Sequence, residues 1–121
     1  MTLEECYVKL GGSYADVKMR LPSQGMIERF LGKFLADGSF EELCRAMDAG
    51  NREEAFRAAH TLKGVCANLG FTRLMTSASQ LTEALRPAQE QIPADAPGLL
   101  DTVRGDYQTT VDAIQEYRSQ S

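Results

Sequence analysis

The chain contains one histidine, His60, which lies in the stretch RAAHTLKGVCANLG and is followed after three and four residues by Lys63 and Gly64. A neutral imidazole can act as a nucleophile without an elaborate base. A lysine ammonium on the same face of a helix can stabilise negative charge that develops at that imidazole. A metal site is not expected, because one histidine without a cluster of cysteines or carboxylates cannot form a usual one.

The position of His60 on its helix decides whether it can do such chemistry. The apolar stripe of this helix lies opposite His60, at about 140° to 200° when each residue turns the helix by about 100°. The stripe consists of Ala58, Leu62, Val65 and Leu69, flanked by Ala55, Ala59 and Cys66. The residues within about 60° of His60 are Glu53, Phe56, Arg57, Lys63, Gly64 and Ala67, with Thr61 and Asn68 a little farther around. We therefore predict that His60 faces solvent.

The neighbours of His60 weigh against two simpler interpretations, a satisfied boundary histidine and an arbitrary surface residue. An arbitrary surface residue would have long charged neighbours, whereas Gly64 lies one turn after His60 and Phe56 one turn before it. Glycine in mid-helix lowers helix stability but leaves space beside the imidazole, which suits the close approach of another protein's backbone or of a phosphoryl group. Phe56, Ala67 and Phe71 predict a small apolar docking patch around the histidine.

Hydrophobic spacing predicts helices that would position this face. One helix follows the N-cap Ser23 and ends at Gly38, and a shorter one runs from a capping box of Ser39 and Glu42 to Gly50. A second capping box begins the His60 helix, which we expect to stop at Gly70. The residues of that box are Asn51 and Glu54.

The second half of the chain continues the helical pattern. Leu74, Ala78, Leu81 and Leu85 form the inward stripe of a helix that should pack against the His60 helix as an antiparallel hairpin. Residues 87–98 contain three prolines and predict an exposed loop, and a last helix interrupted by Gly105 follows it. The predicted fold is all-α: an up-and-down four-helix bundle with an additional short N-terminal helix, forming one domain over residues 1–121 with a core at about 23–118.

The charge and composition of the chain disfavour some classes of partner. The net charge of −4, the pI near 5.0 and the absence of a Lys/Arg block disfavour nucleic acid and anionic membranes as partners. No signal peptide or membrane span is recognisable, so we expect a cytoplasmic monomer. Cys6, Cys44 and Cys66 lack CxxC spacing, which predicts reduced and mostly buried thiols instead of disulfides or a zinc site.

These residues also carry a family resemblance. The segment AHTLKGVCANLG resembles the signature of histidine-containing phosphotransfer (HPt) domains, in which an Ala-His-x-Leu-Lys-Gly core precedes a Leu-Gly helix end. The resemblance extends from Ala46 to Arg86, over the central helical hairpin of that family. The first twenty or so residues and the segment after Pro87 match it only loosely.

The resemblance implies a phosphorelay function. His60 would accept a phosphoryl group from the aspartyl phosphate of a response-regulator receiver domain, or donate one to it, while Lys63 would stabilise the phosphoryl charge and Gly64 would allow partner access. The receiver would supply Mg²⁺, so no cofactor of the chain itself is expected. A hybrid histidine kinase is a further candidate partner. The partner-binding residues implied are Phe56, Arg57, Ala67, Asn68 and Phe71, with Arg57 also assisting electrostatically.

Such a chain is expected to be a phosphoryl carrier and not an enzyme by itself, because it has no P-loop, Gly-rich nucleotide fingerprint or kinase signature. Two alternatives stay open from the sequence. One is the substrate domain of a chemotaxis-type histidine kinase, which normally belongs to a much longer chain. The other is a non-catalytic helical adaptor that binds receiver domains without transferring phosphate.

Overall fold

The computed structural model describes residues 1–120, which contain seven α-helices and no β-strand. The helices are α1 (Leu3–Leu10), α2 (Tyr14–Arg20), α3 (Gln24–Leu35), α4 (Ser39–Asp48), α5 (Arg52–Leu69), α6 (Thr72–Leu85) and α7 (Ala96–Ser119). The prediction of an all-α fold is confirmed.

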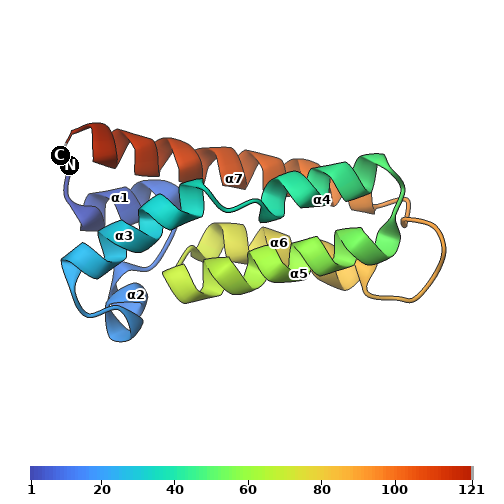
Figure 1. Cartoon of the computed structure of the whole chain (residues 1–121), viewed down its shortest axis with the longest axis horizontal. Coiled ribbons are helices and arrows are strands. Elements are labelled where there is room, and N and C mark those ends of the chain that lie inside the picture. The colour runs from blue at the N-terminus through green and yellow to red at the C-terminus, as the bar shows by residue number, and fades with distance from the viewer. Residues whose placement is uncertain (121) are drawn as a thin grey trace.

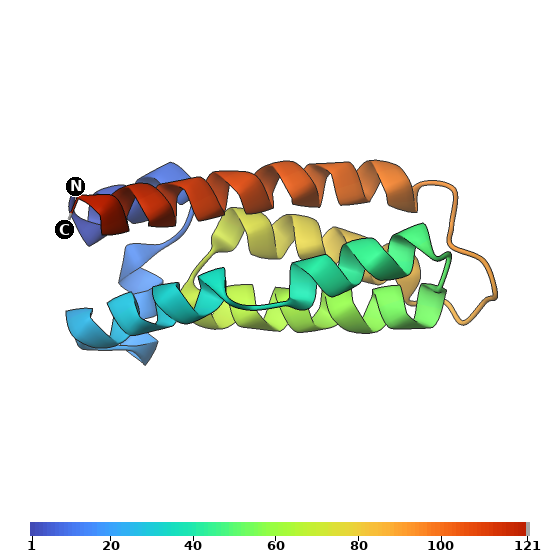
Figure 2. The ribbon, with the colours of Figure 1, turned by 45° about the horizontal axis from the view of Figure 1, so that its top comes forward.

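The helices form an up-and-down bundle (Figure 1 and Figure 2). α3 and α4 follow one another along one edge, α5 returns beside them, α6 runs back against α5, and α7 extends along the length of the molecule. Both termini lie at one end, where the Met1 ammonium donates a hydrogen bond to Gln120 Oε1 at 3.0 Å. The predicted four-helix arrangement is confirmed, with α3 and α4 together forming one of its four rods.

The central hairpin of α5 and α6 turns at Gly70, as predicted. The φ angle of Gly70 is 71°, in the left-handed region that favours glycine. The Phe71 N–H donates to the Cys66 carbonyl at 2.9 Å and the Gly70 N–H to the Ala67 carbonyl at 3.4 Å, so the last carbonyls of α5 are satisfied. This turn folds α6 against α5, while α4 packs along another side of α5.

Two short helices precede the bundle, where the sequence pattern predicted one. α1 begins with a capping box of Thr2 and Glu5, and α2 begins after Ser13, whose Oγ accepts a hydrogen bond from the Asp16 N–H at 3.1 Å. α1 packs against α7 and contributes four buried side chains, Leu3, Cys6, Tyr7 and Leu10. The buried core therefore also includes residues that precede the bundle helices.

One predicted helix cap is wrong and another is confirmed. Ser39 is the first residue of α4 and Gly38 is its N-cap, so Ser39 does not cap the helix. The Asp37 carboxylate accepts the hydrogen bond from the Ser39 N–H at 2.9 Å, which gives that amide an acceptor from outside the helix. At the start of α5, Asn51 Oδ1 accepts from the Glu54 N–H at 3.1 Å as predicted.

The last helix begins earlier than the proline content predicted. Pro97 lies in the first turn of α7, where the missing N–H of proline costs no helical hydrogen bond, so α7 begins at Ala96 and the loop is shorter than 87–98. Gly105 lies within α7 without breaking it. In residues 1–120, no helix combines the length and the apolar character that a membrane crossing requires.

Candidate functional site

His60 is exposed on α5, on the face opposite the buried stripe, as predicted. Its imidazole stacks on the ring of Phe56, one turn earlier, with the ring centroids 6.0 Å apart and the planes inclined by 16°. Phe56 is half-buried and not exposed as predicted, because the Arg86 guanidinium also lies over its ring, 5.2 Å from the centroid. Phe56 therefore supports the imidazole from the preceding turn.

Lys63 follows His60 by one turn of α5 and is half-buried. Among residues 1–120 no hydrogen bond or ion pair of its ammonium is found, in contrast to Arg57 and Arg86 on either side of the site. The Lys63 charge is therefore available to an anion that approaches His60.

Past His60, α5 presents a row of small or short side chains that we call the open strip: Gly64, Ala67 and Asn68. All three are exposed. A Cβ atom built on Gly64 would meet no neighbouring atom within 4 Å, so the chain itself leaves the space beside the imidazole empty. The glycine is thus not required by packing within the bundle, and the space it leaves can be occupied only from outside.

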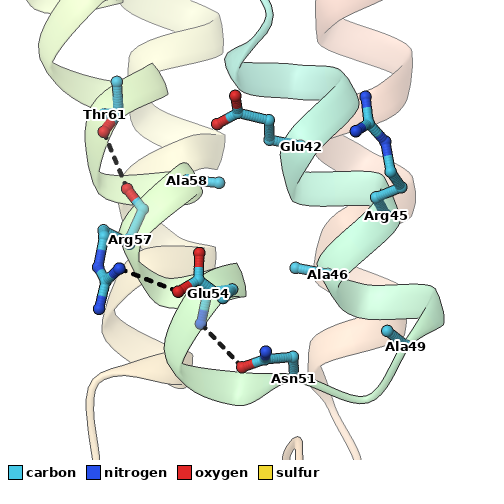
Figure 3. A pocket seen from close by; sticks show the side chains of 9 residues that line it. All are labelled: Glu42, Arg45, Ala46, Ala49, Asn51, Glu54, Arg57, Ala58 and Thr61. Atoms are coloured by element: carbon cyan, nitrogen blue, oxygen red, sulfur yellow. Dashed lines mark hydrogen bonds and ion pairs between the residues drawn. The ribbon is translucent and has the colours of Figure 1, made fainter.

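Arg57 does not contribute a free charge to the site. Its guanidinium forms ion pairs with Glu53 at 3.0 Å and with Glu54 at 2.9 Å. Figure 3 shows the Arg57 side chain directed toward Glu54 at the side of a pocket between α4 and α5, while the Arg57 carbonyl accepts a hydrogen bond from Thr61 Oγ1 at 3.0 Å. The predicted electrostatic assistance by Arg57 is therefore weakened, because two carboxylates compensate its charge.

Phe71 was expected on the apolar rim of the histidine, and this expectation is wrong. Its side chain is completely buried, with ring centroids 5.0 Å from Phe34 and 5.8 Å from Tyr7. The reason is the turn at Gly70, since the residue after a left-handed glycine turns its side chain inward against the last turn of the helix. Phe71 holds the hairpin in the core and cannot touch a partner.

An apolar groove replaces Phe71 as the neighbour of the open strip. It has a volume of about 230 Å³ and lies between α3 and α5. Val65, which the helical wheel assigned to the core stripe, is half-buried and lines this groove together with Asn68 and Phe30. The other lining residues are Lys33, Phe34, Asp37 and Leu69. Part of the apolar surface at the end of the open strip thus comes from α3, which the sequence interpretation did not include.

Two charged residues at the end of α6 were also missed. The Arg86 guanidinium binds the Glu83 carboxylate through two hydrogen bonds of 2.8 and 3.0 Å, and the same guanidinium lies over Phe56. The pKa of the Glu83 carboxyl is below its usual value, mainly because Arg86 donates to it, with smaller effects from the charges of Lys63 and His60. The predicted antiparallel hairpin could have indicated these two residues, because the end of α6 must return beside the first half of α5.

No group of three or more His, Cys, Asp or Glu side chains able to hold a metal ion occurs in residues 1–120. The three cysteines are free thiols, with Cys6 and Cys66 buried and Cys44 half-buried. Besides the ion pairs of Arg57 with Glu53 and Glu54, the charged groups close to His60 are Lys63 and the Glu83–Arg86 pair at the end of α6.

The fold and the site together define a helical module that presents one histidine from its central hairpin, beside an unpaired lysine and an open strip. The model of the Hpt domain family matches residues 26–117, and the chain belongs to this family. Members of the family are phosphocarrier modules of phosphorelays that interact with receiver domains and kinases. The matched range begins in α3 and leaves out α1 and α2. Comparisons with curated proteins and with solved structures gave no match.

Proposed function

We propose that His60 carries the phosphoryl group of a phosphorelay and exchanges it with the aspartate of response-regulator receiver domains. The observation that supports this most strongly is the combination at His60 of an exposed side chain, an unpaired lysine one turn away and the empty space beside Gly64 in the open strip. A histidine with a purely structural role would be enclosed by its neighbours or hydrogen-bonded to them.

The transfer step requires little chemistry from this chain. A lone pair of an imidazole nitrogen attacks the phosphorus of the receiver's aspartyl phosphate, an N–P bond forms, the P–O bond to the carboxylate breaks, and the electron pair of that bond leaves with the carboxylate. The reverse sequence returns the phosphoryl group. Phe56 fixes the ring plane, and the Lys63 ammonium stabilises charge on the transferring group.

Mg²⁺ would come with the receiver domain. The carboxylates nearest the face of His60 are engaged by arginines, Glu53 and Glu54 by Arg57 and Glu83 by Arg86, so none of them is free to hold a cation. Without a nucleotide motif the chain also needs a phosphorylated donor protein. It would therefore act as a carrier that completes its active site only in a complex.

The receiver would dock along the open strip and into the groove between α3 and α5. The open strip and the groove meet at Asn68, and the groove offers half-buried apolar surface from Phe30 and Val65 with the ammonium of Lys33 5.0 Å from the Phe30 centroid. Apolar contacts at the centre of a docking surface with charges at its rim are typical of protein interfaces. The partners that would dock here are response-regulator receiver domains and a hybrid histidine kinase.

The test is transfer of radioactive phosphate from isolated, phosphorylated receiver domains to this protein. We expect the wild type to gain acid-labile, base-stable label at the expense of at least one receiver. The His60→Gln variant should fold, as circular dichroism would show, and should bind the same receiver without gaining label. Binding by the wild type without any transfer would support a receiver-binding adaptor instead and would refute the proposed carrier function.

A further inference from the structure

Glu83 places a carboxylate beside a site that should receive an anion. Glu83 lies in the last turn of α6 and forms an ion pair with Arg86. The Arg86 guanidinium lies over the ring of Phe56, on which His60 stacks. The Lys63 ammonium also attracts this carboxylate. The region facing α6 thus contains two cations suited to a phosphoryl group and one carboxylate that competes for them.

The competition has a definite sign. A phosphoryl group on His60 adds about two negative charges at neutral pH, which a neighbouring carboxylate repels and a neighbouring guanidinium attracts. While the Glu83 carboxylate accepts two hydrogen bonds from the Arg86 guanidinium, those two donors are not available to an incoming phosphoryl group. The negative charge of the Glu83 carboxylate therefore favours the unphosphorylated form of His60.

We propose that Glu83 is a positioning residue that keeps the phosphoryl group on His60 labile by repelling it and by occupying two donors of the Arg86 guanidinium. The inference rests on the proposed function of His60 as the phosphoryl carrier. A relay intermediate must release its phosphoryl group as readily as it accepts it, and a fully cationic pocket would retain it. By binding Arg86, one of the two cations near His60, Glu83 sets how strongly the phosphoryl group is retained; the other cation is Lys63.

The bond whose stability Glu83 would control is the N–P bond of phosphorylated His60. When the phosphoryl group leaves, the N–P bond breaks and its electron pair returns to the imidazole nitrogen, while phosphorus bonds to the oxygen of water or of a receiver carboxylate. In hydrolysis, the protons of the attacking water are shared between the released inorganic phosphate and the imidazole. The departure removes negative charge from beside Glu83 and relieves the repulsion, so the carboxylate speeds both reactions.

Two single variants separate this electrostatic role from a structural one. Glu83→Gln removes the repelling charge and frees Arg86, whereas Arg86→Gln removes a cation and leaves the carboxylate unopposed. If the ion pair only supported the end of α6, both variants would break the same contact and shift any property in the same direction. Opposite shifts are expected only if the two charges act on the phosphoryl group.

The experiment measures the half-life of the phosphorylated protein. The full chain is phosphorylated with phosphoramidate, a small-molecule donor that needs no receiver, then freed of the reagent and followed at neutral pH. We expect the half-life to lengthen about three-fold in Glu83→Gln and to shorten about three-fold in Arg86→Gln, and both effects to shrink in high salt. The matched control is Glu116→Gln, which breaks the similarly exposed ion pair of Lys9 and Glu116 between α1 and α7 and should leave the half-life unchanged.

The outcomes distinguish the two proposals. If His60 is labelled but the half-life in Glu83→Gln equals that of the wild type, or if both variants shift it in the same direction, the role of Glu83 is refuted while the carrier function stands. If phosphoramidate and phosphorylated receivers both fail to label His60 in the folded wild type, the carrier function and the inference that rests on it are refuted together.

Discussion

At the scale of single residues, three residues around His60 each provide a different physical property. Phe56 stacks on the imidazole, the Lys63 ammonium forms no ion pair within residues 1–120, and Gly64 leaves space beside the ring. Gly64 is exposed and Lys63 forms no hydrogen bond or ion pair within residues 1–120, whereas Phe56 packs against the edge of the core. Changes at Lys63 and Gly64 should therefore alter phosphotransfer with little effect on folding.

Replacement of Lys63 by alanine tests the charge. We expect the bundle to keep its thermal stability and transfer from a receiver to slow about ten-fold or more, because a charge-assisted hydrogen bond contributes about 1.5 to 3 kcal/mol. Lys63→Arg should recover part of the rate, since it restores the charge. Rapid-quench kinetics measure both variants. Unchanged transfer in Lys63→Ala would make Lys63 an ordinary surface residue.

A size series at Gly64 tests the space. Gly64→Ala should stabilise the domain by about 0.5 to 1 kcal/mol, because alanine favours the helix and its Cβ meets nothing within 4 Å. Gly64→Gln and Gly64→Phe should fold and transfer progressively more slowly, since the added side chains occupy the approach to His60. Gly105→Gln, at an equally open position of α7, is the control that should not affect transfer. Level rates across the series would contradict a role in partner access.

At the scale of elements, α1 and α2 clamp the end of α5. The Tyr7 hydroxyl donates to the Leu69 carbonyl at 2.7 Å, and the Arg20 guanidinium donates to the carbonyls of Ala67 at 2.7 Å and Asn68 at 3.1 Å. The connection between α1 and α2 adds a hydrogen bond from the Ser13 N–H to the Gly70 carbonyl at 2.9 Å. The open strip is therefore held in place by helices outside the range of the family match.

Gly12 offers a test of this clamp. A Cβ at Gly12 would collide with the carbonyl oxygen of Gly70 and would approach Leu10 to 2.7 Å, and the backbone oxygen cannot move without opening the hairpin turn. We expect Gly12→Ala to lower the free energy of unfolding by about 1 to 3 kcal/mol. Gly105→Ala, in the open interior of α7, should raise it by about 0.5 to 1 kcal/mol. Urea unfolding compares the two, and equal effects would show that the contact is not tight.

The elements show which parts of the fold the sequence could predict. α3 to α6 follow from apolar spacing, and Gly70 was recognised as the end of α5, because these signals are local. The N-terminal pair was underestimated because helices of eight and seven residues owe their stability to the tertiary contacts that they make. The same limit applies to the site: the exposure of His60 is visible on a helical wheel, whereas the ion pair of Arg86 and Glu83 comes from the end of α6 and depends on tertiary packing.

At the scale of the whole molecule, the core encloses two of the three cysteines. Burial raises the pKa of the Cys6 thiol to about 11 and that of the Cys66 thiol to about 12. Burial is also the main cause of the raised pKa of Cys44, which Arg104 partly opposes. Because the thiolate is the reactive form, these shifts leave little of it near pH 8.

Thiol labelling therefore reports on the integrity of the bundle. At pH 8 in native buffer we expect a thiol reagent to modify Cys44 first, while Cys6 and Cys66 react only as fast as the chain unfolds. In urea all three should react rapidly. Cys44→Ser isolates the two buried thiols and serves as the control. Rapid native labelling of Cys6 or Cys66 would show that α1 or α5 separates from the core without global unfolding.

The location of the phosphoryl group tests the central claim most directly. The protein is equilibrated with a phosphorylated receiver domain, digested at neutral to alkaline pH, and mapped by tandem mass spectrometry, since phosphohistidine is lost in acid. We expect one phosphoryl group, on the imidazole of His60, and none on a folded His60→Gln variant. A phosphoryl group on any other residue, or base-stable, acid-labile label that persists in His60→Gln, would contradict the account.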